Sequence, residues 1–318
     1  MISDRNVLVY LFTGFLESGK STFINDTLRD PDFNEGERNL LLCFEEGIEE
    51  YDHKYLKQNC NTDVVYIDSF DKLTLEYLET LDTMYAPDRV IVEFNGTWSV
   101  TQFLDLEMPL DWMVVQIVAT VDAGTFNSYV TNMKSMMYEQ LVHAEMIIFN
   151  RCDASTKKSF LRGNVKAMNR NAQIIYEDIY GNVNQLAEDD LPFDLSKDQL
   201  VIEDDDYGLW YMDALEHPTK YEHKQLTLKG IAFHTEQFGQ PILALGRYAM
   251  VCCEDDTSFI GIGVLDGDFS SIKDGDWIEV TGRVQVDYDS ESNMDYISLV
   301  NTKIVACEPL KDPLVYFN

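Results

Sequence analysis

The fold expected for this chain follows from one stretch of its sequence, Gly14-Phe15-Leu16-Glu17-Ser18-Gly19-Lys20-Ser21-Thr22. This stretch fits the pattern of a phosphate-binding loop, in which a glycine, four other residues, a second glycine, a lysine and a serine or threonine follow in order. An apolar, strand-forming run at residues 6–12 comes directly before it, and a segment of helical length follows. A chance glycine-rich turn is the alternative, but such a turn does not require a strand before it and a helix after it. The stretch therefore predicts a P-loop nucleotide-binding domain.

Each residue type in this loop has a chemical role in phosphate binding. Backbone N–H groups of the loop and of the helix start surround phosphate oxygens. The Lys20 ammonium is expected to neutralise the β- and γ-phosphates, and the Ser21 hydroxyl is expected to bind Mg²⁺. The candidate nucleotide-binding residues of the loop are Gly14, Glu17, Ser18, Gly19, Lys20, Ser21 and Thr22.

A second apolar run ends in an acidic residue that suits magnesium chemistry. Residues 89–92 are followed by Glu93 and, three positions later, by Gly96. This spacing predicts that Glu93 holds the hydration shell of Mg²⁺ or the attacking water, and that the Gly96 N–H senses the γ-phosphate. Without the phosphate loop, an ordinary carboxylate at a strand end followed by a turn glycine would be the better interpretation.

A third motif predicts which base is bound. The strand-like run 146–149 leads into Asn150-Arg151-Cys152-Asp153, a variant of the guanine-reading NKxD pattern. The Asp153 carboxylate can accept hydrogen bonds from N1 and N2 of guanine, which favours GTP over ATP. Arg151 stands where the pattern has lysine, so a guanidinium plane is expected to lie along the base. A chance match of four residues is the alternative for this motif alone.

The charge balance excludes several other functions. The 318 residues include 56 acidic and 24 basic ones, which gives a formal net charge of −32. Such a charge repels nucleic-acid backbones and anionic lipid surfaces, so we expect neither nucleic-acid binding nor membrane insertion. No targeting segment is recognisable, and six scattered cysteines do not resemble a disulfide framework. A cytoplasmic location is therefore expected.

The pattern along the chain predicts two domains. Short apolar runs alternate with helix-length segments up to residue 187, which is typical of an α/β fold with a parallel sheet and helices on both faces. Residues 188–220 are rich in acid and are predicted to be a solvated linker. Residues 221–318 contain strand-like runs separated by glycine, which predicts a small antiparallel β-barrel or sandwich with an OB-like appearance.

The succession of motifs resembles the CobW-like branch of the SIMIBI-class P-loop GTPases, relatives of HypB and UreG. The resemblance covers about residues 6–187 and rests on the segments GFLESGKST, CFEEGIEEYD, VIVEFNG, VATVDAGTF, EQLVHAEMIIFNRCD and MNRNAQIIYEDIYGNV. By this resemblance, Glu45 and Gly47 match an ExG element of switch I, and the other matching positions are Gly14, Gly19, Lys20, Ser21, Glu93, Gly96, Asn150 and Asp153.

The resemblance implies a function and a set of roles. GTP binding and slow hydrolysis would drive a conformational switch for metal handling or metallochaperone action on a metalloprotein client. Lys20, Glu45 and Glu93 would be catalytic, and Ser21, Glu45 and Glu93 would bind Mg²⁺. A homodimer across the nucleotide face is common in the class, and GDP would be the product nucleotide.

The chain departs from the family in two places. A CxCC metal motif is expected after switch I, but only Cys60 stands there, and one thiolate cannot hold Zn²⁺ or another transition metal. The segment 246–261 resembles the soluble domain of YcgQ-type partners of putative permeases. It contains Cys252 and Cys253, which with His234 form a speculative transition-metal site, whereas a buried strand end is the simpler interpretation.

Two alternatives to the metal-handling GTPase stay open on the sequence. The permease-partner resemblance favours a nucleotide-gated adaptor or regulator of a membrane permease, in which binding rather than hydrolysis is the function. A small-molecule kinase shares the phosphate loop, but no acceptor motif accompanies it and the Asn150–Asp153 motif favours guanine.

Overall fold

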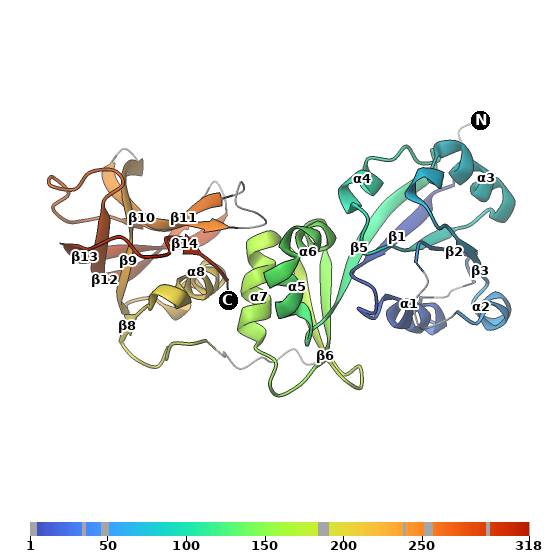
Figure 1. Ribbon diagram of the computed structural model, residues 1–318, viewed down its shortest axis with the longest axis horizontal. Helices are drawn as coiled ribbons and strands as arrows, with labels where there is room; N and C mark the ends of the chain where they lie inside the picture. The colour runs from blue at the N-terminus through green and yellow to red at the C-terminus, as the bar shows by residue number, and fades with distance from the viewer. Residues whose placement is uncertain are drawn as a thin grey trace. The chain divides into compact units, whose positions relative to one another are not determined.

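The chain folds into two units with separate cores (Figure 1). The computed structural model describes residues 5–33, 36–45, 51–183, 191–237, 240–250, 257–290 and 293–317. One unit consists of Met1–Thr156 and Met168–Leu186, and the other of Lys157–Ala167 and Ala187–Asn318. Among the described residues, no helix has the length and apolar character needed to cross a lipid bilayer.

A seven-stranded parallel sheet forms the centre of the first unit. Its strand order is β3-β2-β4-β1-β5-β6-β7, and every neighbouring pair is parallel. The strands are β1 (Val7–Thr13), β2 (Asn39–Cys43), β3 (Thr62–Tyr66), β4 (Arg89–Glu93), β5 (Trp112–Asp122), β6 (Met146–Cys152) and β7 (Gln173–Asp178). The predicted parallel α/β sheet is therefore confirmed. Its edge strand β7 was not predicted from the sequence.

Both faces of this sheet are covered, as the uninterrupted burial of strands such as β2 requires. On one face, Leu41 packs with Ile24 of helix α1 and Leu56 of helix α2. On the other face, Phe44 and Phe94 pack against Phe103 of helix α4. The helices of this unit are α1 (Lys20–Arg29), α2 (His53–Asn59), η1 (Phe70–Lys72), α3 (Leu75–Tyr85), α4 (Val100–Leu104), α5 (Phe126–Asn132) and α6 (Lys134–Leu141).

A closed five-stranded barrel forms the second unit. Its strands are β9 (Gln225–Gln237), β10 (Gln240–Met250), β11 (Thr257–Val264), β12 (Trp277–Asp289) and β13 (Met294–Ala306). They pair in the ring β9-β10-β11-β13-β12-β9, which confirms the predicted small barrel. The pairing of β11 with β13 is parallel, contrary to the antiparallel expectation. An odd number of strands cannot alternate in direction all round a closed ring, so at least one pair must be parallel.

The acidic stretch predicted to be a linker differs from that expectation over the residues that can be described. Strand β8 (Gln199–Val201) pairs with β9, and after the turn η2 (Asp204–Asp206) comes helix α8 (Tyr207–Glu216). Tyr207 and Trp210 are completely buried in the core of the barrel unit. Residues 199–220 are thus part of a folded unit, whereas Glu188, Asp189 and Asp190 lie outside the described residues.

The barrel unit is completed by two short elements and one helix that comes from earlier in the sequence. Strand β14 (Leu314–Val315) pairs with β10, and η3 (Pro218–Lys220) follows α8. Helix α7 (Lys158–Met168) lies between β6 and β7 in the sequence, but residues 157–167 belong to the barrel unit. In that unit the Asn164 side chain donates a hydrogen bond to the Phe317 carbonyl.

Candidate nucleotide-binding site

The predicted phosphate loop connects β1 to α1 at the carboxyl edge of the parallel sheet. Gly14 and Gly19 have left-handed backbone angles, with φ of 124° and 99°, which glycine adopts without strain. A side chain at Gly14 would place its Cβ 2.3 Å from the Thr120 carbonyl oxygen of β5. Helix α1 begins at Lys20, and its N-cap residue, Gly19, provides no side-chain cap. The start of such a helix favours a bound anion.

Lys20 is buried in the middle of the site. Only 3% of its surface is exposed, and its ammonium donates hydrogen bonds to the carbonyl oxygens of Gly14 at 2.8 Å and Phe15 at 2.9 Å. It also forms an ion pair with the Glu45 carboxylate. The phosphate loop thus holds its lysine by its own backbone, with the charged group pointing into the site.

Glu93 ends β4 beside this lysine and is also buried, with 3% of its surface exposed. Its Oε1 accepts a hydrogen bond from the Ser21 hydroxyl at 2.5 Å, and its Oε2 accepts one from the Tyr51 hydroxyl at 2.8 Å. Burial raises the pKa of Glu93 above its ordinary value, whereas the two hydrogen bonds act in the opposite direction. Burial and the Glu93 charge also raise the pKa of Tyr51, so Tyr51 stays a donor. The predicted pair Ser21 and Glu93 is therefore brought together.

Glu45 reaches the same site from the segment after β2. One of its oxygens pairs with Lys20, and the other accepts a hydrogen bond from the Gly96 N–H at 3.4 Å. A Cβ at Gly96 would come within 2.6 Å of the Gly14 carbonyl, so only glycine fits at this contact. Glu45 therefore contacts Lys20 and Gly96, and its expected role as a magnesium ligand stays a prediction. Gly47 lies outside the described residues.

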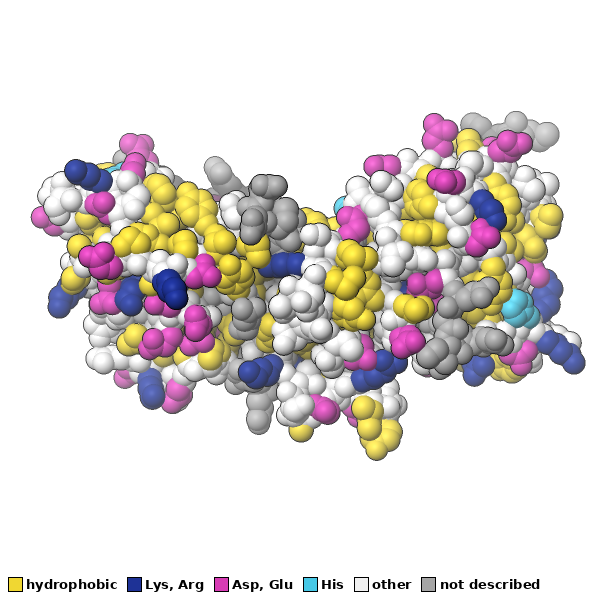
Figure 2. All heavy atoms as spheres, in the orientation of Figure 1, with side chains coloured by type: hydrophobic (Ala, Val, Ile, Leu, Met, Phe, Trp, Pro, Cys, Tyr) yellow, Lys and Arg dark blue, Asp and Glu magenta, His cyan; other side chains and the backbone are white. Residues whose placement is uncertain are grey.

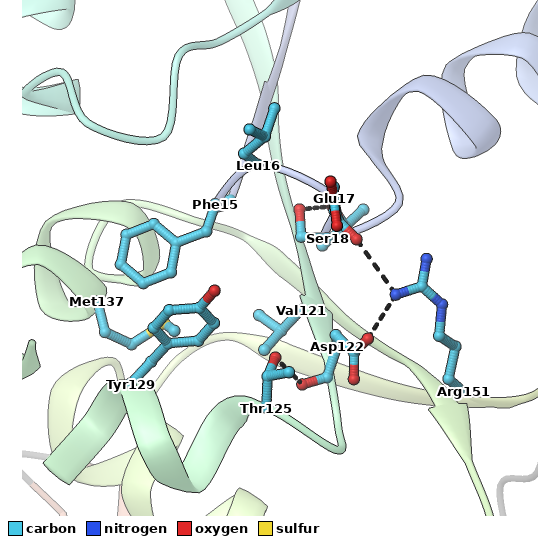
Figure 3. Close-up of a pocket in the computed structure, with 12 residues that line it drawn as sticks. Phe15, Leu16, Glu17, Ser18, Val121, Asp122, Thr125, Tyr129, Met137 and Arg151 are labelled. Atoms are coloured by element: carbon cyan, nitrogen blue, oxygen red, sulfur yellow. Dashed lines mark hydrogen bonds and ion pairs between the residues drawn. The ribbon is translucent and has the colours of Figure 1, made fainter. Parts of the chain in front are cut away.

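Two of the predicted base-reading residues, at the end of β6, form hydrogen bonds with the phosphate loop. The Asn150 side-chain amide donates to the Ser18 carbonyl at 2.6 Å, and its Oδ1 is buried without a hydrogen-bond partner among the described residues. Arg151 donates to the Glu17 carbonyl at 3.2 Å and pairs with Asp122, as Figure 3 shows. Its guanidinium thus joins the phosphate loop to the end of β5 through its edge. The expected contact of its plane with a base stays a prediction.

Asp153 is exposed and holds the turn that follows β6. Its Oδ1 accepts hydrogen bonds from the Ser155 N–H at 2.8 Å and from the Ser155 hydroxyl at 2.6 Å. These hydrogen bonds lower the pKa of Asp153, so it is a carboxylate at neutral pH. An ionised acceptor is what the predicted contact with guanine requires.

A small pocket lies beside the phosphate loop (Figure 3). Its volume is about 90 Å³. Phe15 and Tyr129 line it with an edge-to-face contact of 4.6 Å between ring centres, and Met137 lies next to them. Because ligand pockets for molecules of drug size have volumes of several hundred cubic ångströms, this pocket is too small for a nucleotide.

Only part of the predicted transition-metal site can be described. His234 of β9 is paired with Leu243 of the neighbouring strand β10, and its Nδ1 lies 2.8 Å from Asp274. Cys252 and Cys253 lie outside the described residues, so a site that combines them with His234 stays a prediction. Within the described ranges, His, Cys, Asp and Glu form no cluster of three or more suited to a metal ion.

Three buried side chains that contact predicted site residues were not predicted from the sequence: Tyr51, Thr120 and Gln140. Tyr51 donates to Glu93, and the Ser18 and Thr120 hydroxyls lie 2.9 Å apart. The Gln140 side chain of α6 accepts from the Gly14 N–H at 3.2 Å and donates to the Trp98 carbonyl at 3.0 Å. These contacts join residues far apart in the chain, so no local pattern could have revealed them.

Acidic groups outnumber the one buried cation at this site. Lys20 faces the carboxylates of Glu45 and Glu93, and Figure 2 shows acidic side chains on both units of the face in view. The described side chains around Lys20 therefore carry more negative than positive formal charge.

Comparisons with known proteins agree with this geometry. Residues 8–176 match the nucleotide-binding domain of the CobW/HypB/UreG family, and residues 180–317 match the DUF1980 C-terminal domain. A comparison with curated proteins gave no match.

Two solved structures are similar to this chain. The hydrogenase maturation factor HypB from Archaeoglobus fulgidus is 16% identical, with 56% of this chain and 84% of HypB covered and a TM-score of 0.39. The Zn(II)-bound YjiA GTPase from E. coli is 14% identical, with 85% of this chain and 92% of YjiA covered and a TM-score of 0.43.

Proposed function

We propose that this chain, which belongs to the CobW/HypB/UreG nucleotide-binding family, binds GTP with Mg²⁺ and hydrolyses it slowly to GDP and phosphate. The observation that carries the proposal is the arrangement of Lys20, Ser21 and Glu93 around a phosphate loop with left-handed glycines. This arrangement provides a cation, a hydroxyl and a carboxylate at the place where the triphosphate would lie.

The donor set fits magnesium. Ser21 and Glu93 offer oxygen atoms, which Mg²⁺ prefers. The Ser21 hydroxyl oxygen keeps its lone pairs while the hydroxyl donates a hydrogen bond to Glu93. Tyr51 holds the second oxygen of Glu93, so the carboxylate has a fixed orientation. When bound, Mg²⁺ would neutralise charge on the β- and γ-phosphates.

The residues of this chain would assist hydrolysis mainly by positioning and charge neutralisation. Water attacks the γ-phosphorus, the bond to the bridging oxygen of the β-phosphate breaks, and GDP leaves with the electron pair. Lys20 neutralises the charge that develops on the phosphate oxygens, and the Gly96 N–H contributes a hydrogen bond. Arg151 is held by Glu17 and Asp122 on the base side of the loop. Because no arginine finger is recognisable in the sequence, we expect slow turnover.

Guanine preference is supported by the loop after β6. The Asn150 Oδ1 is buried without a partner among the described residues, and Asp153 is ionised and exposed. A base with N–H groups on its Watson–Crick edge can donate to such a carboxylate, whereas adenine presents an acceptor at N1.

The test is a titration of nucleotide-free protein with GTP, GDP and ATP in Mg²⁺ buffer and in EDTA, followed by measurement of phosphate release. We expect guanine-selective binding that needs Mg²⁺, with slow release of phosphate from GTP. Equal binding of ATP and GTP would show that Asn150 and Asp153 do not read the base. Binding of neither nucleotide would reject the proposal.

The second domain favours one further candidate function. Residues 180–317 match the DUF1980 C-terminal domain, which is outside the nucleotide-binding domain and consistent with the resemblance to permease partners. We therefore propose, as the alternative, that the nucleotide state regulates binding to a membrane permease. Co-purification with such a protein in the GTP state only would support this alternative. Release of stoichiometric Zn²⁺ or Co²⁺ on hydrolysis would instead support metal handling.

A further inference from the structure

A single carboxylate contacts both groups that are expected to receive the γ-phosphate. Glu45 pairs with the Lys20 ammonium through one oxygen and accepts from the Gly96 N–H at 3.4 Å through the other. Lys20 is expected to contact the β- and γ-phosphates, and the Gly96 N–H the γ-phosphate alone. The position between them is therefore that of the γ-phosphate rather than of the β-phosphate.

The hydrogen bonds of Lys20 leave no free donor for a phosphate. An ammonium has three N–H donors. Two of them form hydrogen bonds with the carbonyl oxygens of Gly14 and Phe15, and the third is directed to the ion pair with Glu45. The two carbonyls belong to the phosphate loop itself, and the Phe15 carbonyl also accepts from the Ser18 N–H at 3.1 Å. Glu45 is therefore the partner that can leave without unfolding the loop.

The charges around Lys20 also indicate that a phosphate can replace Glu45 in the ion pair with Lys20. Glu93 already lies beside Lys20 and is held there by Ser21 and Tyr51. A γ-phosphate that arrived with Glu45 still in place would bring a third anion to one buried ammonium. Because like charges at such distances repel strongly in a buried site, the phosphate and the Glu45 carboxylate exclude each other.

We propose that the Glu45 carboxylate is an internal competitor of the γ-phosphate and that its displacement from Lys20 and Gly96 is how this protein distinguishes GTP from GDP. This inference rests on the proposed function and deepens it.

The test compares binding of GDP and of a GTP analogue with an imido group between the β- and γ-phosphates, which is not hydrolysed. Both are labelled with a fluorescent ribose substituent and titrated in Mg²⁺ buffer against wild-type protein and Glu45→Gln. We expect the variant to bind the analogue about tenfold more tightly relative to GDP, which corresponds to about 1.4 kcal/mol. Glu45→Ala, which removes the acceptor completely, should shift the ratio further in the same direction.

Glu79→Gln is the control, because Glu79 is an exposed carboxylate of helix α3, outside the nucleotide site. This substitution should leave the affinities for both nucleotides unchanged. Equal factors for the two nucleotides in Glu45→Gln, or weaker binding of the analogue, would overturn the inference and leave the proposed function intact. Failure of the wild type to bind any guanine nucleotide would overturn both.

Discussion

Buried charge serves different purposes in the two units. In the barrel unit, Asp213 is almost completely buried and accepts hydrogen bonds from Arg162 at 2.6 Å and from the Tyr221 hydroxyl at 2.7 Å, with Lys220 at 3.5 Å. In the nucleotide-binding unit, two carboxylates share the buried Lys20. The cluster around Asp213 has an excess of donors, so no ligand is needed to balance it. Among the described residues, the cluster around Lys20 has an excess of acid, so a bound cation would balance its charge.

This difference predicts which substitutions affect binding and which affect stability. The largest effect is expected for Lys20→Ala, which removes the one buried cation of the nucleotide site. Charge-assisted hydrogen bonds contribute about 1.5–3 kcal/mol each, so GTP affinity should fall at least ~100-fold. Isothermal titration calorimetry measures this change, with Lys57→Ala on the exposed pair with Asp63 as the control. Unchanged affinity in Lys20→Ala would reject the phosphate-loop assignment.

Asp213→Asn should act on stability instead. The substitution leaves Arg162 and Lys220 facing a neutral side chain at a buried position, and breaking a buried ion pair costs about 3 kcal/mol. Urea unfolding of the full chain should show this loss, whereas Asp63→Asn on the exposed pair should cost less than about 1 kcal/mol. The comparison between the two units fails if Asp213→Asn is as mild as the surface variant.

Tyr51→Phe should have an intermediate effect on binding. It removes the hydrogen bond that orients Glu93 and that lowers its pKa. We expect GTP affinity in Mg²⁺ to fall roughly tenfold, in line with one hydrogen bond to a charged group, and the pH midpoint of binding to move upward. Tyr55→Phe on α2 is the control. A loss of affinity without a shift of the midpoint would indicate only a structural role.

The smallest effect is expected from pH on the wild-type protein. The pKa of Glu93 is raised by burial, and only the ionised carboxylate supports magnesium. Affinity for GTP in Mg²⁺ should therefore be complete above this raised pKa and decrease as the pH falls through it. The decrease should begin at a higher pH than that of an exposed glutamate, which titrates near ~4.3. Glu93→Gln should bind weakly at every pH and show no such midpoint.

The sequence predicted the parts of the site that depend on local pattern. Gly14, Lys20, Ser21 and Glu93 follow strands directly, and the carboxyl ends of parallel strands meet at one edge of a sheet. Their positions could therefore be inferred from the order of strands. The contacts of Tyr51 and Gln140 join segments 42 and 126 residues apart, so they depend on packing that no short motif encodes.

Helix α8 shows how composition can mislead. Three consecutive aspartates, Asp204–Asp206, precede it and favoured a solvated linker, yet the buried Arg247 pairs with the first of them at 2.8 Å. The helix itself buries most of its residues, including Trp210, which places it among the core elements of the barrel unit. An apolar and aromatic run that directly follows an acidic run is therefore better interpreted as a core helix preceded by a charged turn.

Helix α7 sets a limit on how this protein can be divided. It follows the predicted base-reading loop in the sequence, yet residues 157–167 belong to the barrel unit, where Arg162 pairs with Asp213. The chain therefore enters the barrel unit, returns to the sheet with β7 and enters the barrel unit again. A truncation near residue 187 would leave the excised nucleotide-binding half with a helix whose partners are gone. The two halves are consequently not interchangeable modules, and recombination between relatives would have to exchange α7 together with the barrel.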